Sequence, residues 1–492
     1  MKTTLNKRCN LLLSLLAVLM MTFSTSSPAQ GDTQQNWTSI EGTTYRSTLG
    51  NFSVPEVRDN GSSKQIELKY RVIHGKVPDR FVFFFNGGPG ISNLTGRYSD
   101  QLLHDFSVVE LGYRGIDSST SLACPHYDKI LKTSPLINDT QRERVAQAFA
   151  QCTEDYRQQG LDPRGYGLDE MVDDVDDFRK KLGAKQIHLF ALSYGTRIAL
   201  QYMTRYPAQT GPSVLIGANP KGHFHWAKAE LSPLYVAYEK HLNGQIPAHA
   251  GGLEGLMAEV LENAPAKSWG IKLDRDRIRV VTHALLFHTK TAPLVLDAYL
   301  KAFENNDYKG LAVLSFAHDL VLPRIFEWGD FAFKALGEDY NRTTDYLAES
   351  QPKQGEIGSP ISELFFAAPL GEVLSALNMP PMEPIHITTE TLILSGELDF
   401  STPPQIATEE LDERFDAVQQ LIVPKLGHVE DFISQPGPTF ELTTQWMKEA
   451  TQADVRFQAP EIKVHKTFGI GSVIPLSWLF LTLVTGGIVW FI

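Results

Sequence analysis

The segment 187–207, "IHLFALSYGTRIALQYMTRYP", places Ser193 between an apolar run and an amphipathic run. Residues 187–191 form a short apolar run of the kind that predicts a buried strand. After Gly195 apolar residues recur at helical spacing, which predicts a helix. The opposite face of that helix is polar and carries Arg197, Gln201 and Arg205. Ser193 is therefore predicted to occupy a sharp strand-to-helix corner.

Such a corner crowds the two positions that flank the serine at a distance of two residues. These positions hold Ala191 and Gly195, so the segment fits the nucleophile elbow G-x-S-x-G with alanine in place of the first glycine. The turn would raise the Ser193 hydroxyl above the sheet, and the helix N-terminus would stabilise negative charge beside it. The pattern predicts a nucleophilic serine.

Short β-rich runs alternate with helical patterns along the chain and predict a mainly parallel sheet with helices on both faces. The predicted strands are 65–73, 81–85, 107–111, 186–191, 213–216, 391–395 and 420–423. Between residues 217 and 384 the strand pattern lapses and helical runs replace it, such as 253–263 and 277–288. We expect a helical cap inserted into the α/β core.

The predicted organisation has six parts. They are a signal peptide (1–29), the first part of the α/β core (30–217), the helical cap insertion (218–384), the second part of the core (385–455), a linker (456–466) and a C-terminal transmembrane or sorting segment (467–492).

The two ends of the chain predict export. Basic residues precede the apolar stretch 11–23, and small residues follow it at 27–29, as in a secretory signal peptide. Residues 467–492 carry no charge and include close to the ~20 apolar residues that cross a bilayer. Basic residues at Lys463 and Lys466, with His465 between them, oppose the positive-inside tendency. Removal of the tail by a sorting enzyme or a lipid-anchoring transamidase is therefore the alternative to a membrane anchor in a periplasmic or extracellular protein.

Composition limits the partners of the chain. The formal net charge is −12, whereas nucleic-acid binding requires a surplus of Lys and Arg. Two cysteines, Cys124 and Cys152, remain after the predicted signal peptide. An oxidising compartment favours a disulfide between them, and a pair of buried free thiols is the alternative.

A nucleophilic serine needs a base, and in this architecture the chain order is serine, acid, histidine. His428 and His465 are the two histidines beyond the last predicted strand, and His465 adjoins the apolar tail. His428, in "LIVPKLGHVEDF", is therefore the predicted base. The strand-edge sequence "TLILSGELDFSTPP" offers Asp399 as the acid that orients it, with Glu397 as the alternative.

An acyl-transfer site also needs backbone donors for an oxyanion. The segment "FVFFFNGGPGIS" predicts a strand that runs into Gly87, Gly88 and Gly90. We expect the amides of Gly88 and Tyr194 to form the oxyanion hole, with Gly87 as the alternative to Gly88.

These stretches resemble the α/β-hydrolase fold and, within it, the proline iminopeptidase and tripeptidyl aminopeptidase-like serine peptidases. The matching segments are "FNGGPGIS", "YRGIDSS", "SYGTRIALQYMTRYP", "LILSGELDFSTPP" and "LGHVEDF", in the family's order. The resemblance implies a Ser193–Asp399–His428 triad beneath a helical cap. Cys124 and Cys152 fall where exported members often carry a pair.

The chain departs from this family at several positions. Gly112 and Tyr113 stand where Asp-Gln is usual, in a loop that braces the site.

Residues 324–333 loosely resemble a cap segment whose acid holds the free amine of the substrate, which suggests Glu327 or Asp330.

The predicted function is that of an exported serine aminopeptidase that releases an N-terminal residue or short peptide. A carboxylesterase or lipase uses the same triad and is the alternative, and a catalytically inactive binding protein is a further one. A serine carboxypeptidase fits less well, because Leu192 stands where that family has a glutamate. No His-Glu-x-x-His motif or phosphate-binding loop occurs, so we expect neither a metal nor a cofactor.

Overall fold

The computed structural model describes residues 32–464, apart from 59–60, 62, 243, 351–355, 378–383, 412–413 and 463. The predicted signal peptide and the C-terminal segment lie outside the described residues, as do Lys463, His465 and Lys466. Among the helices that are described, none is both long and apolar enough to cross a membrane.

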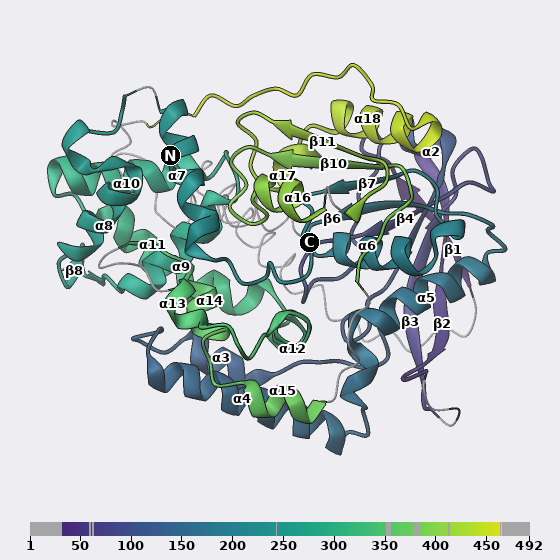
Figure 1. The fold of residues 1–492 in the computed structure, drawn as a ribbon, viewed down its shortest axis with the longest axis horizontal. Helices are drawn as coiled ribbons and strands as arrows, with labels where there is room; N and C mark the ends of the chain where they lie inside the picture. The colour runs from purple at the N-terminus through teal and green to yellow at the C-terminus, as the bar shows by residue number, and fades with distance from the viewer. Residues whose placement is uncertain are drawn as a thin grey trace, which may run out of the picture.

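A nine-stranded sheet forms the core, in the order β1-β2-β3-β5-β4-β6-β7-β10-β11 (Figure 1). The strands are β1 (Thr33–Thr38), β2 (Thr44–Pro55), β3 (Gln65–Ile73), β4 (Phe81–Phe85), β5 (Ser107–Leu111), β6 (His188–Leu192), β7 (Ser213–Ile216), β10 (Thr391–Gly396) and β11 (Val418–Val423). The block from β5 to β11 is parallel, and β1, β2 and β3 join it in antiparallel register. The predicted mainly parallel sheet is confirmed.

Central strand β4 explains why helices cover both faces of the sheet. Its five residues are all buried, and successive side chains point to opposite faces. The ring of Phe83 faces Phe178 of α5 (Leu168–Lys181), on the side that α6 (Gly195–Arg205) also covers. Phe84 joins the opposite cluster, which includes residues of α2 (Asp100–Asp105) and α18 (Pro436–Glu449). A strand buried on both faces is continuously apolar, as the sequence of β4 is.

Four predicted strands match β3, β4, β5 and β7 residue for residue, and the ends of the other three differ by one or two residues. Strands β1 and β2 were not predicted. Strand β1 is mostly polar and exposed, and it is held by backbone pairing with β2 and by the contact of Trp37 with Tyr98. Neither periodicity nor an apolar run marks such an edge strand.

The predicted cap region is helical. Its helices are α7 (Lys228–His241), α8 (Gly252–Glu262), α9 (Arg275–Leu286), α10 (Ala292–Asn305), α11 (Lys309–Ile325), α12 (Trp328–Asp339), α13 (Tyr346–Ser350), α14 (Pro360–Phe365) and α15 (Gly371–Leu377). A short hairpin interrupts them and consists of two strands of two residues each, β8 (Lys267–Ser268) and β9 (Ile271–Lys272). We call this set of helices the cap.

Helices α3 (Pro125–Leu131) and α4 (Asp139–Gln158) pack with the cap and not on the sheet (Figure 1). Their neighbours include α11, α12, α14 and α15, and α4 also contacts the 3-10 turn Pro163–Tyr166. Both helices lie in the predicted core part 30–217. Their amphipathic pattern indicates that one face is buried but not which surface buries it.

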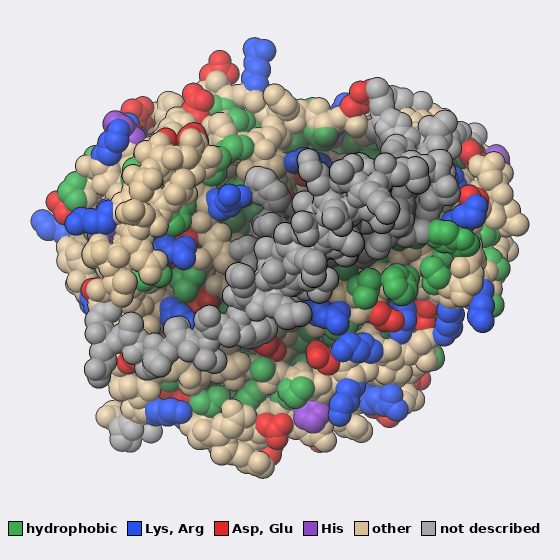
Figure 2. All heavy atoms as spheres, turned by 180° about the vertical axis from the view of Figure 1, so that it is seen from behind, with side chains coloured by type: hydrophobic (Ala, Val, Ile, Leu, Met, Phe, Trp, Pro, Cys, Tyr) green, Lys and Arg blue, Asp and Glu red, His purple; other side chains and the backbone are tan. Residues whose placement is uncertain are grey.

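Acidic and basic side chains are interspersed over the face of the molecule that Figure 2 shows. Neither sign of charge forms a separate band among the described residues visible there. The surplus of acidic residues behind the net charge of −12 is thus not gathered in one patch on this face.

Cys124, which directly precedes α3, forms a disulfide with Cys152 of α4. The expected pairing is therefore present, and both residues are buried. The bond ties the start of α3 to the second half of α4 and closes the segment between them.

We expect the double variant Cys124→Ser/Cys152→Ser to unfold more easily than the wild type. The two cysteines are 28 residues apart, and a bridge over such a loop stabilises a protein by roughly 3–4 kcal/mol through the entropy of the unfolded chain. Guanidinium unfolding followed by circular dichroism measures the difference. Reduced wild type should match the variant, and equal midpoints for oxidised wild type and the variant would contradict the expectation.

Candidate active site

The predicted site residues lie at one edge of the parallel block. Ser193 follows β6, Asp399 follows β10, His428 follows β11, and residues 86–90 follow β4. The carboxyl ends of parallel strands meet at the same edge of a sheet, which is where open α/β sheets bind ligands. We call residues 86–90 the glycine loop.

Ser193 occupies the turn between β6 and α6 with a φ of +48°. Residues other than glycine rarely adopt this left-handed backbone conformation, so the φ of Ser193 indicates local strain. The Ser193 amide donates to the carbonyl oxygen of Ile216 at 2.9 Å, which holds the turn against β7. The side chain itself is half-buried at the sheet edge.

Gly195 explains why the elbow needs a small residue after the serine. A Cβ at this position would lie 2.4 Å from the carbonyl oxygen of Phe85, at the end of β4. Without a side chain, the first turn of α6 can sit directly on that strand end. Ala191, on the other side of the serine, is fully buried in β6.

Asp399 and His428 are directly hydrogen-bonded. The Nδ1 atom of His428 lies 2.8 Å from Oδ2 of Asp399. The other oxygen, Oδ1, accepts the amides of Ser401 and Thr402, each at 2.8 Å. The Thr402 hydroxyl also donates to Oδ2 at 2.7 Å. These bonds fix the carboxylate, so that Nδ1 of the imidazole is the donor and Nε2 is left as an acceptor.

His428 and Ser193 contact adjacent residues at the end of β7. A Cβ at Gly217 would lie 3.0 Å from Cε1 of His428, and the neighbouring Ile216 binds the Ser193 amide. The His428 amide donates to the carbonyl oxygen of Phe287, just past α9, at 2.7 Å. The imidazole is thus held between the sheet edge and the cap.

The pKa of His428 is raised above its ordinary value. Burial by itself lowers this pKa, because it disfavours the charged ring, but the charge and hydrogen bond of Asp399 outweigh that effect. Because its hydrogen bond to Asp399 favours the charged ring, His428 is suited to accept a proton.

Glu397, the alternative acid, has other partners. Its carboxylate pairs with Nε2 of His241 in α7 at 2.9 Å and accepts the Lys425 amide at 2.9 Å. The carboxylate that binds His428 is that of Asp399.

The glycine loop lies against the serine. A Cβ at Gly87 would lie 3.3 Å from Cβ of Ser193. The Gly87 amide already donates to Oδ1 of Asn86 at 2.9 Å, which argues against it as an oxyanion donor. Gly88 has a φ of +122°, a conformation that requires glycine. Tyr194 stands at the start of α6, where backbone amides lack intrahelical acceptors.

A network of buried hydrogen bonds braces the glycine loop. The Asn86 amide donates to the Asn93 side chain at 2.7 Å, and Asp117 accepts the Asn93 amide at 2.8 Å. The Tyr113 hydroxyl donates to the Asn86 carbonyl oxygen at 2.9 Å. Tyr113 was predicted to lie in a bracing loop, whereas Asn93 and Asp117 were not singled out. Asn93 directly follows the motif "FNGGPGIS", and Asp117 lies within "YRGIDSS".

The two predicted amine-binding acids differ in their surroundings. Asp330 is fully buried, pairs with Nζ of Lys334 at 2.7 Å and accepts the Gly90 amide at 3.0 Å. Glu327, at the start of α12, is half-buried. Partial burial raises its pKa, against the lowering effect of the Cys124 and Gly329 amides. Both carboxylates thus have internal partners, and the two acids differ in that Asp330 is fully buried and Glu327 is partly accessible.

A second buried network, which the sequence analysis missed, links α12 to the elbow. Arg197 of α6 binds Asp339 through two hydrogen bonds of 2.6 and 2.7 Å. The Tyr194 hydroxyl donates to Oε1 of Glu338 at 3.2 Å. Burial raises the pKa of Glu338 to about 7, although Arg197 lowers it. The end of α12 therefore contacts the residue next to Ser193.

Within the described part of the chain, His126, Cys152 and Asp155 lie close enough to share a metal ion. Cys152 is bonded to Cys124, however, and a disulfide sulfur offers no thiolate ligand. The remaining pair, His126 and Asp155, is partly exposed. These residues do not fit a metal centre.

We expect Asp399→Asn to lower the pKa of His428 below its ordinary value. Burial, the largest influence, lowers this pKa, and the variant removes the charge of Asp399 that opposes it most strongly, so that only the smaller raising effects of Glu430 and Asp431 remain. NMR titration of isotope-labelled imidazoles measures the change. Asp416→Asn, which alters an exposed carboxylate, is the control and should leave His428 unchanged. A wild-type pKa below the ordinary histidine value would contradict the expectation.

Comparisons with known proteins agree with this architecture. A family model described as alpha/beta hydrolase fold matches residues 81–243, which include the glycine loop and the elbow. A curated protein of Escherichia coli (strain K12), "Putative hydrolase YuaR", is 25% identical over 197 residues. That match covers 37% of this chain and 38% of the relative, so the chain spans well under two thirds of the relative's length.

Two solved structures are similar at low identity. A serine hydrolase from Cycloclasticus zankles has a TM-score of 0.36 and 12% identity, and the match covers 82% of this chain and 99% of that one. Epoxide hydrolase A from Mycobacterium thermoresistibile has a TM-score of 0.37 and 13% identity, with 82% and 98% covered. The family model and the observed strand order together show that the chain has the α/β-hydrolase fold.

Proposed function

We propose that the protein is a serine hydrolase in which Ser193 is the nucleophile, His428 the general base and Asp399 the carboxylate that orients it. The observation that carries the proposal is the 2.8 Å bond between Asp399 and His428, at the sheet edge where Ser193 occupies a strained elbow. Residues with a strained backbone cluster at active sites. The order of the three residues along the chain also fits this fold.

In the proposed reaction, Oγ of Ser193 attacks a carbonyl carbon while Nε2 of His428 takes the serine proton. Asp399 stabilises the imidazolium that forms. The same proton then passes to the leaving group, and water releases the acyl group by the reverse sequence. The amides of Tyr194 and Gly88 are the proposed donors to the developing oxyanion.

We further propose that the substrate carries a free amino terminus, so that the enzyme is an aminopeptidase. An exopeptidase of this kind must recognise a charged amine near the scissile bond. The Glu327 amide donates to the Gly90 carbonyl oxygen at 2.8 Å, so this partly accessible residue lies beside the glycine loop. Glu327 is the proposed amine-binding residue. Asp330 is not, because it is fully buried and already paired with the charged Lys334.

We also propose that the protein is exported. The Cys124–Cys152 disulfide supports this, because such bonds form and persist in oxidising compartments. The predicted signal peptide and C-terminal anchor lie outside the described residues.

We expect aminoacyl, dipeptidyl or tripeptidyl arylamides with a free amine to be hydrolysed, and Ser193→Ala to lower kcat about 10⁴-fold or more, because it removes the nucleophile. Release of the arylamine measures the rate, and a fluorophosphonate probe reports whether Ser193 reacts. The matched control is each substrate with an acetylated amine, which should turn over far more slowly.

Three outcomes would contradict the aminopeptidase proposal. Equal rates on free and acetylated arylamides would show that the enzyme does not recognise the substrate's amine. Hydrolysis of acyl esters without any amidase activity would favour an esterase. Cleavage of peptides that are blocked at the N-terminus but free at the C-terminus would favour a carboxypeptidase.

We expect Glu327→Gln to raise KM for free-amine arylamides about 10- to 100-fold, the size of a lost charge-assisted hydrogen bond. Turnover of a short acyl ester, which has no amine, should change little. Steady-state kinetics on both substrates measures the split. Glu372→Gln, in an exposed acid of α15, is the control. A parallel loss on amine and ester substrates would show that Glu327 does not bind the amine.

A further inference from the structure

The first turn of α12 holds one end of the glycine loop. Gly90 donates its amide to Oδ2 of Asp330 at 3.0 Å and accepts the Glu327 amide at 2.8 Å. A Cβ at Gly90 would lie 2.8 Å from the Glu327 carbonyl oxygen, so the two backbones are in close contact. The position of this loop therefore depends on the position of α12.

The opposite side of the same turn rests on the 121–124 segment, which precedes α3. A Cβ at Gly329 would lie 1.9 Å from the Leu122 carbonyl oxygen and 2.7 Å from Cβ of Cys124. Such distances leave no room for any side chain. Gly329 is thus the point at which α12 touches the 121–124 segment.

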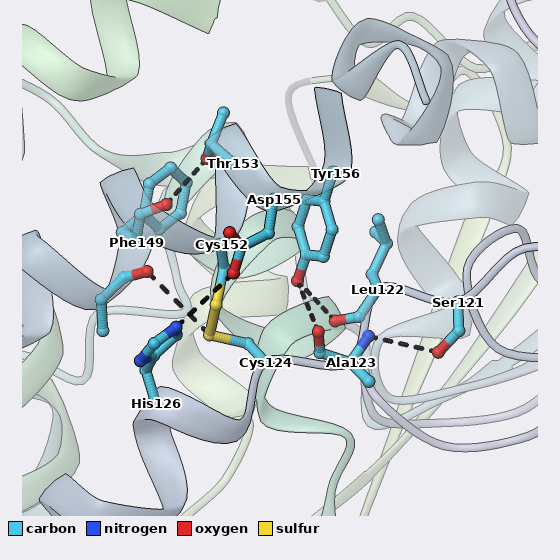
Figure 3. Close-up of a disulfide and its surroundings, with 11 residues drawn as sticks. Ser121, Leu122, Ala123, Cys124, His126, Phe149, Cys152, Thr153, Asp155 and Tyr156 are labelled. Atoms are coloured by element: carbon cyan, nitrogen blue, oxygen red, sulfur yellow. Dashed lines mark hydrogen bonds and ion pairs between the residues drawn. A yellow bond between two sulfur atoms is a disulfide. The ribbon is translucent and has the colours of Figure 1, made fainter. Parts of the chain in front are cut away.

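Helix α4 holds that segment in two ways (Figure 3). Cys152 is bonded to Cys124, and the Tyr156 hydroxyl donates to the Leu122 carbonyl oxygen at 2.7 Å. Cys152 and Tyr156 are four residues apart on one helix and so share a face. Figure 3 shows both side chains directed at the 121–124 segment.

We propose that the Cys124–Cys152 disulfide and Tyr156 are positioning groups for the glycine loop, and that they act through Gly329 and the first turn of α12. The contacts form a continuous path from α4 to the 121–124 segment, to α12 and to Gly90. None of these residues touches the reacting atoms. They decide where the oxyanion donor of the glycine loop stands relative to Ser193.

The catalytic part of this inference rests on the proposed serine-hydrolase function, in which the glycine loop supplies an oxyanion donor. Such a donor acts mainly in the transition state, so its displacement lowers kcat and leaves KM nearly unchanged. A small displacement of the donor lowers the rate markedly, because stabilisation of the oxyanion depends on the position of the donor.

Two substitutions with matched controls test the path. Gly329→Ala forces a methyl group against Leu122, whereas Gly337→Ala, in the same helix, adds one that meets nothing within 4 Å apart from its chain neighbours and the helix backbone. Tyr156→Phe removes the hydroxyl that binds Leu122, whereas Tyr127→Phe removes a buried hydroxyl that has no hydrogen-bond partner. Cys124→Ser/Cys152→Ser is a third test variant.

We expect the three test variants to lower kcat about 5- to 50-fold per titrated active site with KM within about twofold of wild type. Affinity for a trifluoromethyl ketone, whose oxyanion occupies the same donors, should fall in parallel. Hydrogen exchange should accelerate in residues 86–91 of each test variant. The two control variants should match wild type in every measurement.

The proposal is overturned if exchange in residues 86–91 is the same in test and control variants, or if kcat per titrated site is unchanged. A fall in the number of titrated sites with normal turnover per site would show a merely structural role and would also overturn it. Failure of the proposed function is distinguishable, because it appears as wild-type turnover that does not depend on Ser193. The exchange measurement then decides on the positioning path by itself.

Discussion

The close approach of the first turn of α6 to the end of β4 is the contact on which the site depends. A Cβ at Gly195 would lie 2.4 Å from the Phe85 carbonyl oxygen, so only glycine permits this approach. It leaves Ser193 in a left-handed conformation above the sheet edge and brings the glycine loop, which continues from Phe85, against the serine. Parallel strand direction then delivers Asp399 and His428 to the same edge.

Helix α12 is the second determinant of the site's geometry. Its first turn binds Gly90 in the glycine loop, and its last turn binds Tyr194 and Arg197 in the elbow. One cap helix therefore contacts both segments that carry proposed oxyanion donors. The ion pair of Arg197 with Asp339 is fully buried, and such pairs add little net stability because desolvation offsets their attraction. The pair joins the last turn of α12 in the cap to α6 in the core.

Much of the core could be predicted because strands buried on both faces carry continuous apolar runs, as β4 does. The edge strand β1 could not, since all its residues but Trp37 are polar and it depends on long-range contacts, backbone pairing with β2 and packing of Trp37 on Tyr98. Arg197 and Gln201 were assigned to a polar helix face, yet both are buried. A polar residue looks the same in sequence whether water or a buried carboxylate lies opposite, and α12 comes from more than a hundred residues away.

The sequence by itself determined the local features: the strand–serine–helix turn at Ser193, the order in which Asp399 and His428 follow it, and a glycine-rich turn after β4. These depend on backbone sterics and short-range periodicity, which act over a few residues. Only the tertiary structure decided that Asp399 and not Glu397 binds His428, that Asp330 is enclosed while Glu327 is partly accessible, and that α3 and α4 join the cap. Those outcomes depend on which distant surfaces bury one another, and that is a property of the packed chain and not of any local pattern.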